Sequence, residues 1–449
     1  MKHRRIGRFA MLLFGTVIAL GSFGQGKRTL TLTEAIELGI KNSKQLKGST
    51  ARIEEAVAAV REAEERRLPE AGVTGSYLRL NNPNIDLKAK TNSGGTGGGT
   101  TTGDSPKPSQ AMYGMINASV PIFSGFRIKY GIESAKYLQQ AAELDAENDK
   151  EEIALNTIDA YNNLYKSKAA VDLVNENLQS ARERAAQFSN LEKNGLLPRN
   201  ELLKAQLQVS NTELSLLDAQ NNWKLANINM DLMLGLPEAT ELVIDSASLQ
   251  AAFSLKSIED YVQAGLQNRK DLSAIDYRKK AASTAIKISK GEKYPSLAVT
   301  GGYVAANIPT VLSVTNAVNL GLGVQYSISS LWKNNSKVKQ AEAREKQVAA
   351  NEELLADAIR LQINQAYQNY LSSQKKIEVY QTAIAQATEN YRIVNNKYQN
   401  SLATTTELLD ADVAQLQARL NYAFAKSDAL VAYNKLLQAA GLLTQTTNK

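Results

Sequence analysis

The distribution of apolar positions along the chain predicts two very long helices. In the first, within residues 126–193, apolar and small side chains recur in steps of three and four: Ala160, Leu164, Ser167, Val171, Val174, Leu178, Ala181, Ala185 and Phe188. The second, over 332–399, repeats this spacing: Ala366, Tyr370, Ser373, Ile377, Tyr380, Ile384, Ala387, Tyr391 and Val394. Such a spacing places one narrow stripe on each helix and is typical of coiled-coil packing.

Before each long helix the pattern changes to a period of two. Apolar residues alternate with small or polar ones over 111–122 and 318–328, and less regularly near 72–80 and 297–306. Strands of about ten residues with one apolar face have the length and the pattern of tilted transmembrane β-strands. A surface hairpin that packs one face on a core gives the same pattern, so the strands alone leave both interpretations open.

Short motifs mark the ends of the predicted helices. Thr31 and Ser257 each open a capping-box pattern, and the helix that follows is expected to run to about Arg67 or Lys293 before a proline stops it. Each long helix ends in a turn, Asn194–Pro198 or Asn400–Thr404, where asparagine and glycine suit a left-handed cap. A returning helix follows each turn.

These elements occur twice because the chain contains one unit duplicated. Residues 31–77 align without a gap on 257–303, and 135–236 align on 341–442. The two alignments differ in offset, so the first copy is longer between 78 and 134, where Thr91–Thr100 is rich in glycine and threonine. We therefore expect two pseudo-equivalent halves of one architecture.

The expected boundaries are as follows. A signal peptide covers 1–24, because a basic start and an apolar stretch precede small residues; an uncleaved anchor is the alternative. The first repeat, 25–256, has strands near 72–80 and 111–122, a long helix over 126–193, a returning helix over 198–235 and a linker over 236–256. The second, 257–449, has strands near 297–306 and 318–328, a long helix over 332–399, a returning helix over 404–440 and a tail over 441–449.

Composition removes several kinds of chemistry. The only histidine is His3, inside the signal, and there is no cysteine. Zinc sites of imidazole or thiolate and Ser-His-Asp or Cys-His catalysis are therefore excluded from the processed chain. We predict no enzymatic activity, no cofactor and no metal site. Once the basic signal is removed, little net positive charge remains, which argues against binding to nucleic acid.

The strands constrain the assembly. Four strands cannot close into a barrel, and an open sheet edge in lipid has no hydrogen-bond partner. Several chains must therefore pool their strands if these enter a membrane. Two chains would give eight strands with a filled interior, whereas three would give twelve and leave a lumen.

The duplicated plan resembles the TolC-like outer-membrane efflux proteins, or outer-membrane factors, over residues 30–443. The resemblance is most specific at the turns: Tyr398, Ser401-Leu402 and Asp410-Ala411 in the second copy, Asn194-Gly195-Leu196, Glu201-Leu202-Leu203 and Ala205 in the first. The opening Leu32-Thr33-Glu34-Ala35-Ile36, with Gly39 and Asn42, resembles the family's opening.

This resemblance implies a mainly α fold with a transmembrane β-barrel. The expected assembly is a homotrimer with a 12-stranded barrel in the outer membrane on a 12-helix coiled-coil tunnel in the periplasm. It implies a passive exit duct of a tripartite efflux pump that exports small molecules, joined to a periplasmic adaptor (membrane fusion protein) and an inner-membrane transporter. The alternatives are an exit duct for type I protein secretion and, in a different class, a periplasmic coiled-coil structural protein.

The candidate constriction lies just past the second turn. Glu407 and Asp410 share one helix face, and in a trimer they would form rings of carboxylates that favour cations. The resemblance places an acidic constriction here. The first copy keeps the acid Glu201 but has Lys204 in the second place. A solvated face at a helix N-terminus is the simpler alternative.

Two further groups are candidates. The turn residues Gly195, Leu196, Leu197, Ser401, Leu402 and Ala403 would meet the adaptor by resemblance, or would only fold back on the last helical turn. Tyr391 and Tyr398 lie on one side of the second long helix, where they either pack or take part in gating hydrogen bonds.

Overall fold

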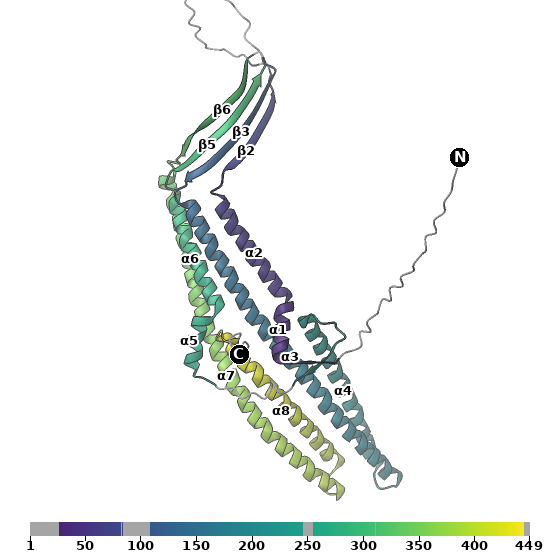
Figure 1. The fold of residues 1–449 in the computed structure, drawn as a ribbon. Coiled ribbons are helices and arrows are strands. Elements are labelled where there is room, and N and C mark those ends of the chain that lie inside the picture. The colour runs from purple at the N-terminus through teal and green to yellow at the C-terminus, as the bar shows by residue number, and fades with distance from the viewer. Residues whose placement is uncertain (1–26, 82, 84–107, 246–254, 310, 444–449) are drawn as a thin grey trace, which may run out of the picture. The chain divides into compact units, whose positions relative to one another are not determined.

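The computed structural model describes residues 27–81, 83, 108–245, 255–309 and 311–443. The predicted signal peptide, the segment Thr91–Thr100 and parts of the predicted linker and tail lie outside these residues. Within them the chain is mostly helical, with one four-stranded and one two-stranded sheet (Figure 1). No helix of the described part combines the length and the apolar character needed to cross a membrane.

The same order of elements occurs twice. The first copy contains α1 (Leu32–Asn42), α2 (Lys44–Glu65), β2 (Glu70–Arg79), β3 (Gln110–Phe123), α3 (Arg127–Lys193) and α4 (Arg199–Leu234). The second contains α5 (Ile258–Asn268), α6 (Lys270–Gly291), β5 (Ser296–Ile308), β6 (Leu312–Gln325), α7 (Ser330–Gln399) and α8 (Thr405–Ala439). Two short strands complete the described elements, β1 (Lys27–Leu30) and β4 (Glu241–Ile244).

The expectation of one continuous helix before each pair of strands was wrong. The first breaks into α1 and α2 because Ser43 caps a new helix: its hydroxyl accepts a hydrogen bond from Leu46 N at 3.1 Å. The second breaks at Arg269, whose backbone is extended and whose guanidinium donates to Asp271 and Gln362. A side chain that caps or binds at the break replaces the backbone bonds that a continuous helix would have made.

The chain forms two compact units that do not coincide with the two repeats. The hairpin unit comprises Met1–Asn42, Thr157–Ala252 and Lys376–Asp428. The sheet unit comprises Ser43–Asn156, Phe253–Lys375 and Ala429–Lys449. Each unit thus combines segments of both copies, and α3, α7 and α8 contribute to both units.

The sheet unit contains one antiparallel sheet in the order β2-β3-β5-β6 (Figure 1). Its register separates two faces. One face is apolar: Val73 pairs with Ile116, Ile116 with Tyr303 and Tyr303 with Val318. The other is small or polar: Thr74, Asn117, Thr300, Asn319 and Gly321 lie on it. The apolar face is exposed in a single chain, with Val318 77 % and Leu320 84 % accessible.

The core of the hairpin unit forms around the start of the first copy. β1 and β4 pair in parallel, and the sequence analysis had not predicted the strand β1. The buried Tyr161 of α3 donates its hydroxyl to Leu30 O at 3.0 Å, and Leu164, Met230 and Leu234 pack around it. Further along α3 the predicted seam is buried at Val174, Leu178, Ala181 and Phe188. The heptad spacing therefore marks the side of α3 that packs.

A buried carboxyl lies at the end of α4. Asp231 is fully buried; its Oδ2 accepts from Asn227 Nδ2 at 2.9 Å, whereas its Oδ1 has no hydrogen-bond partner. Burial, assisted by the charge of Glu238, raises the pKa of Asp231 to about 6. Because the pKa is raised, the protonated carboxyl stabilises the fold. This contribution is complete below the unfolded pKa of about 4 and is lost as the pH rises through about 6.

We expect Asp231→Asn to stabilise the protein at pH 7.5 by about 2 kcal/mol and to have little effect near pH 4, since the amide stays neutral at both. The measurement is the unfolding midpoint of the purified protein as a function of pH. Asp218→Asn, at an exposed position of the same helix, is the matched control and should leave the profile unchanged. An unchanged profile for Asp231→Asn would show that this carboxyl is ionised at little cost.

Candidate functional site

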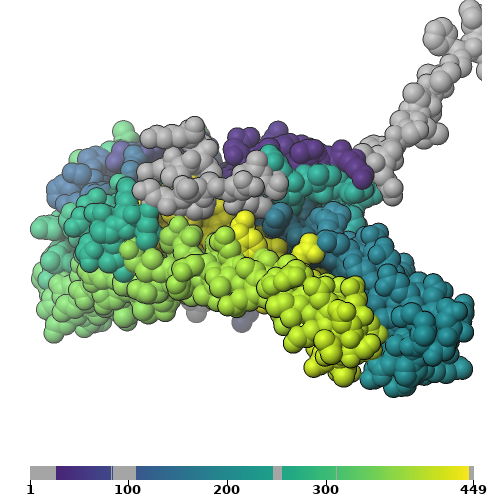
Figure 2. Space-filling model, turned by 90° about the horizontal axis from the view of Figure 1, so that it is seen from below, coloured from purple at the N-terminus to yellow at the C-terminus, as the bar shows by residue number. Residues whose placement is uncertain are grey.

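The candidate site is built by the ends of the two helical hairpins, α3–α4 and α7–α8, inside the hairpin unit. The ends lie against one another, the first in teal and the second in yellow-green in Figure 2. Both turns close in the same way. Gly195 and Ser401 adopt positive φ, and the next residue, Leu196 or Leu402, donates its N–H to a carbonyl of the last helical turn at 2.8 Å. Both turns are Schellman caps; the second has Ser401 in the position that favours glycine.

The turn residues differ in exposure. Leu196 is 74 % and Leu402 is 76 % exposed, so both side chains point away from the cap. Leu197 is half-buried and packs on the cluster of Phe188, Leu202, Ala205 and Leu408. The turns therefore present one leucine each to the surroundings, while Leu197 holds the hairpin ends together. Gly195 and Ser401 are exposed, and Ala403 is half-buried.

Glu407 caps the start of α8. Its carboxylate accepts from Thr404 N at 2.7 Å and from the Thr404 hydroxyl at 3.0 Å, and that hydroxyl accepts from Glu407 N at 3.2 Å. This is a capping box, which the motif Thr404-x-x-Glu407 would have indicated. The backbone hydrogen bond from Thr404 lowers the pKa of Glu407, and the hydroxyl adds to this. The side chain is exposed and stays ionised.

Asp410 lies one turn further along α8 and is also exposed. Glu407 and Asp410 therefore share an accessible stretch of helix, as the sequence predicted from their spacing.

In the first hairpin the acidic residue Glu201 is paired with a lysine of the same helix. Lys204 Nζ lies 3.1 Å from a Glu201 carboxylate oxygen and 3.4 Å from the Thr406 hydroxyl of the second hairpin. The Thr405 hydroxyl, followed by Lys204, lowers the pKa of Glu201. Lys204 therefore pairs with a neighbour, and Glu201 and Lys204 together link the two hairpin ends.

The two tyrosines contact the first hairpin. Tyr398 stacks on Phe188 of α3, with ring centroids 5.4 Å apart, and its hydroxyl accepts from Thr405 at 3.4 Å. Tyr391 accepts a hydrogen bond from the Arg184 guanidinium at 3.0 Å. Tyr398 is thus mainly a packing residue, whereas Tyr391 belongs to a polar network.

That network centres on a buried ion pair that sequence reasoning missed. Arg184 Nη1 of α3 lies 3.1 Å from Asp412 Oδ2 of α8, and the two side chains are only 9 % and 5 % exposed. Asn177 Nδ2 donates to the same Asp412 oxygen at 3.2 Å. Burial alone would lower the pKa of Arg184, but the hydrogen bond and charge of Asp412 raise it. The pair joins α3 to α8, and Tyr391 adds α7.

A signal for this pair was present in the sequence. The seam of α3 passes from Ala181 to Phe188, and Arg184 fits a step of three and four as well as Ala185 does. A charged residue in such a stripe needs an opposite charge in the facing stripe, and Asp412 follows directly on the buried Ala411. Two more ion pairs connect the same helices, Lys166 with Asp428 at 2.8 Å and Glu176 with Arg419 at 2.8 Å.

The hairpin ends enclose a groove of about 930 Å³. Arg184, Phe188, Tyr391 and Tyr398 line its inner part, and the residues of both turns line its mouth, among them Leu196, Leu197, Glu201, Lys204, Ser401, Ala403 and Thr404. Its lining offers hydroxyl, amide and charged groups beside the aromatic rings. Such a surface suits contact with a protein segment.

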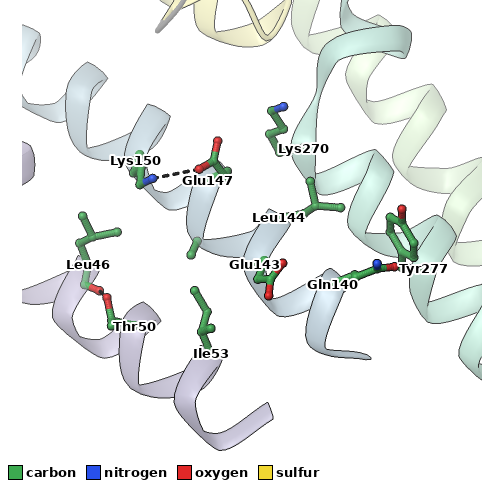
Figure 3. A pocket seen from close by; sticks show the side chains of 11 residues that line it. Leu46, Thr50, Ile53, Gln140, Glu143, Leu144, Glu147, Lys150, Lys270 and Tyr277 are labelled. Atoms are coloured by element: carbon green, nitrogen blue, oxygen red, sulfur yellow. Dashed lines mark hydrogen bonds and ion pairs between the residues drawn. The ribbon is translucent and has the colours of Figure 1, made fainter. Parts of the chain in front are cut away.

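A second groove, of about 620 Å³, lies in the sheet unit (Figure 3). Leu46, Thr50 and Ile53 of α2 face Leu144 of α3 across it, and Tyr277 of α6 forms another wall. Glu147 and Lys150 in its lining pair with each other at 2.9 Å. Among the described residues there is no cluster of histidine, cysteine or acidic residues that could hold a metal ion.

Comparison with known families gives a match over most of the chain. The family described as outer membrane efflux protein matches residues 35–236 and 261–442. The two matched segments correspond to the two copies found by internal alignment.

Individual relatives agree in length and fold. The outer membrane efflux protein BepC of Brucella suis biovar 1 (strain 1330) is 23 % identical over 444 residues, which is 97 % of this chain and 90 % of BepC. The structure of CusC superposes with a TM-score of 0.74 at 20 % identity, covering 91 % of this chain and 92 % of CusC. The outer membrane protein VceC of Vibrio cholerae superposes with a TM-score of 0.72 at 19 % identity, covering 91 % and 96 %.

We expect removal of one partner of the buried pair to cost more than removal of both. Asp412→Leu alone leaves Arg184 buried and unpaired, at a cost of about 3–5 kcal/mol, and the double variant Arg184→Met/Asp412→Leu should recover most of it. The measurement is a double-mutant cycle on the unfolding free energy of the purified protein. Glu389→Gln, which breaks an exposed pair with Arg392, is the control and should leave the unfolding free energy nearly unchanged. Additive single effects would contradict the coupling.

Proposed function

The chain belongs to the outer membrane efflux protein family, and from this premise we propose that it is a passive exit duct for small molecules in a tripartite efflux pump. As a member of that family it is an outer-membrane protein of transport and not an enzyme. The observation that carries the proposal is the match of both copies to the family, together with a sheet whose apolar face is exposed.

We propose that three copies of the chain close one barrel of twelve strands. In the described sheet β2 and β6 are the edge strands, each paired on one side only. Lipid offers no hydrogen bonds, and each unsatisfied backbone group costs several kcal/mol there. Pairing β6 of one copy with β2 of the next satisfies these groups and leaves the apolar face toward lipid. A barrel of three copies has twelve strands and leaves a lumen, whereas a barrel of two copies has eight strands and its side chains fill the interior.

The helices support the same assembly. α4 carries a row of leucines that one chain leaves more than half exposed: Leu203, Leu207, Leu214, Leu217, Leu225 and Leu232. Their spacing is close to that of a second coiled-coil seam, so a helix of a neighbouring copy fits on it. A homotrimer would thus build a tunnel of twelve helices, which we place in the periplasm.

We propose that the exposed turns dock the periplasmic adaptor. Leu196 and Leu402 are exposed although they end two well-closed turns, so folding back on the helix does not explain them. Leu196 lines the groove between the hairpin ends, and Leu402 lies between Ser401 and Ala403, which also line it. In this proposal the inner-membrane transporter selects the substrate. The class of exported molecule, and whether the duct serves type I secretion, therefore depend on that partner.

The same end of the chain is the proposed gate. Glu407 and Asp410 supply the acidic mouth in the second hairpin, whereas in the first Lys204 offsets Glu201. The links at Glu201, Lys204, Tyr391 and Tyr398, and the buried pair of Arg184 with Asp412, tie the two hairpins together. Opening would require these contacts to break or to move together.

We expect Leu196→Asp with Leu402→Asp to abolish export, because charges at both turns prevent docking of an apolar surface. The trimer should persist in membranes, as shown by its heat-modifiable migration. The measurement is drug susceptibility of cells that depend on this duct. Leu207→Asp, at an exposed leucine of α4, is the contrasting variant and should disturb the trimer instead. Normal resistance in the double variant would refute the docking role.

We expect Glu407→Gln with Asp410→Asn to lower cation selectivity in planar bilayers, because the acidic rings are removed while glutamine still accepts the capping bond at α8. The measurement is the reversal potential in a salt gradient. Glu213→Gln, on the exposed side of α4 and paired with Arg182, serves as the control. Unchanged reversal potentials in the double variant would reject the acidic mouth.

A further inference from the structure

The strands of the sheet unit are almost free of charge. Across β2, β3, β5 and β6 the only charged residues are Glu70 and Arg79, the first and last residues of β2. The register places them on opposite faces: Glu70 pairs with Ser119 on the small and polar face, and Arg79 pairs with Gln110 on the apolar face. Glu70 is therefore the one charge that the small and polar face of these strands carries.

One row of this face alternates glycine and asparagine across all four strands. Gly72 pairs with Asn117, Asn117 with Gly302 and Gly302 with Asn319. A β-carbon added to Gly72 would lie 3.3 Å from Asn117 Oδ1, and one added to Gly302 would lie 2.9 Å from Asn319 Oδ1. Each amide thus lies sideways over the glycine of the next strand. The row presents neutral dipoles and keeps its side chains close to the sheet.

We propose that the outer-membrane section of the duct lets cationic, anionic and neutral solutes pass alike, because Glu70 is the sole charge that its four described strands carry on their small and polar face. This inference rests on the proposed function, which turns the small and polar face toward the lumen. Glu70 lies two residues before Gly72 on β2, roughly 7 Å along the strand. Beyond it a solute meets hydroxyls, amides, glycines and the uncharged side chains of Tyr113, Met115 and Val304. Discrimination by charge along the duct then comes from the hairpin unit and not from the strands.

The absence of cysteine from the chain makes this testable, because a single introduced cysteine is the only thiol. Asn319→Cys probes the small and polar face, and Val318→Cys, the adjacent residue on the apolar face, is the matched control. Each is treated in intact cells with two membrane-impermeant thiol reagents of similar size and opposite charge. The rates are divided by those of a free thiol with the same reagents, and outer-membrane levels are checked by immunoblot.

We expect Asn319→Cys to react with both reagents and Val318→Cys, facing lipid, with neither. Asn319 lies three strands from Gly72, on the order of 16 Å from Glu70, so the screened attraction should favour the cationic reagent by less than about twofold in the normalised rates. In the Glu70→Gln background this preference should fall to about one, because no other charge remains on this face.

Each contrary result points to a different error. A preference of about tenfold, or one that survives Glu70→Gln, would show that other charges reach this part of the lumen, and it would overturn the inference. Reaction at Val318→Cys without reaction at Asn319→Cys would mean that the faces are reversed, and would also overturn it while leaving the duct intact. No reaction at either position in intact cells, with reaction at both after lysis, would instead refute the proposed function.

Discussion

The requirement that backbone groups in lipid find hydrogen-bond partners governs this molecule. β2 and β6 pair on one side only within the described sheet, and the face that they share with β3 and β5 is apolar and exposed. In a soluble protein such a sheet would be an aggregation hazard, but for an outer-membrane protein it is one part of a closed structure. The same incompleteness recurs in the helices, where the leucines of α4 stay exposed. In the proposed trimer, neighbouring copies would complete both surfaces.

The hairpin unit is held by contacts of a different kind. Apolar seams pack the helices side by side, and they tolerate sliding because neighbouring turns look alike. The buried pair of Arg184 and Asp412 removes that freedom, since a charge buried without its partner is costly. Around it Tyr391 accepts a hydrogen bond from Arg184, and Asn177 donates one to Asp412. Stability thus comes mainly from the seams. The buried cluster fixes the register of α3 against α8, together with the exposed pairs Lys166–Asp428 and Glu176–Arg419.

Much of this fold can be predicted from the sequence because its elements are long and periodic. The alternation at 318–328 and the steps of three and four at 160–188 indicate β6 and α3 without any knowledge of contacts. The breaks at Ser43 and Arg269 were missed because a local capping bond competes with a helix that the pattern would continue. The pairing of β1 with β4 and of Arg184 with Asp412 joins residues far apart in the chain, and spacing along one strand or helix carries no information about such partners. The capping box at Thr404 and Glu407 could have been predicted from the sequence. The sequence analysis considered for Glu407 only a constriction and the general preference for acidic residues at helix starts.

The two returning helices begin by different chemistry, and this makes the hairpins unequal toward acid. Pro198 caps the start of α4; it presets the backbone and has nothing to titrate. Thr404 precedes α8, and its N–H is held by the carboxylate of Glu407, a group whose pKa that bond lowers. Protonation of Glu407 therefore removes the carboxylate that caps α8, whereas the Pro198 cap of α4 has no group that could titrate. In the first hairpin a drop in pH acts instead on the Glu201 bridge to Lys204, so acid reaches the two helix starts through different groups.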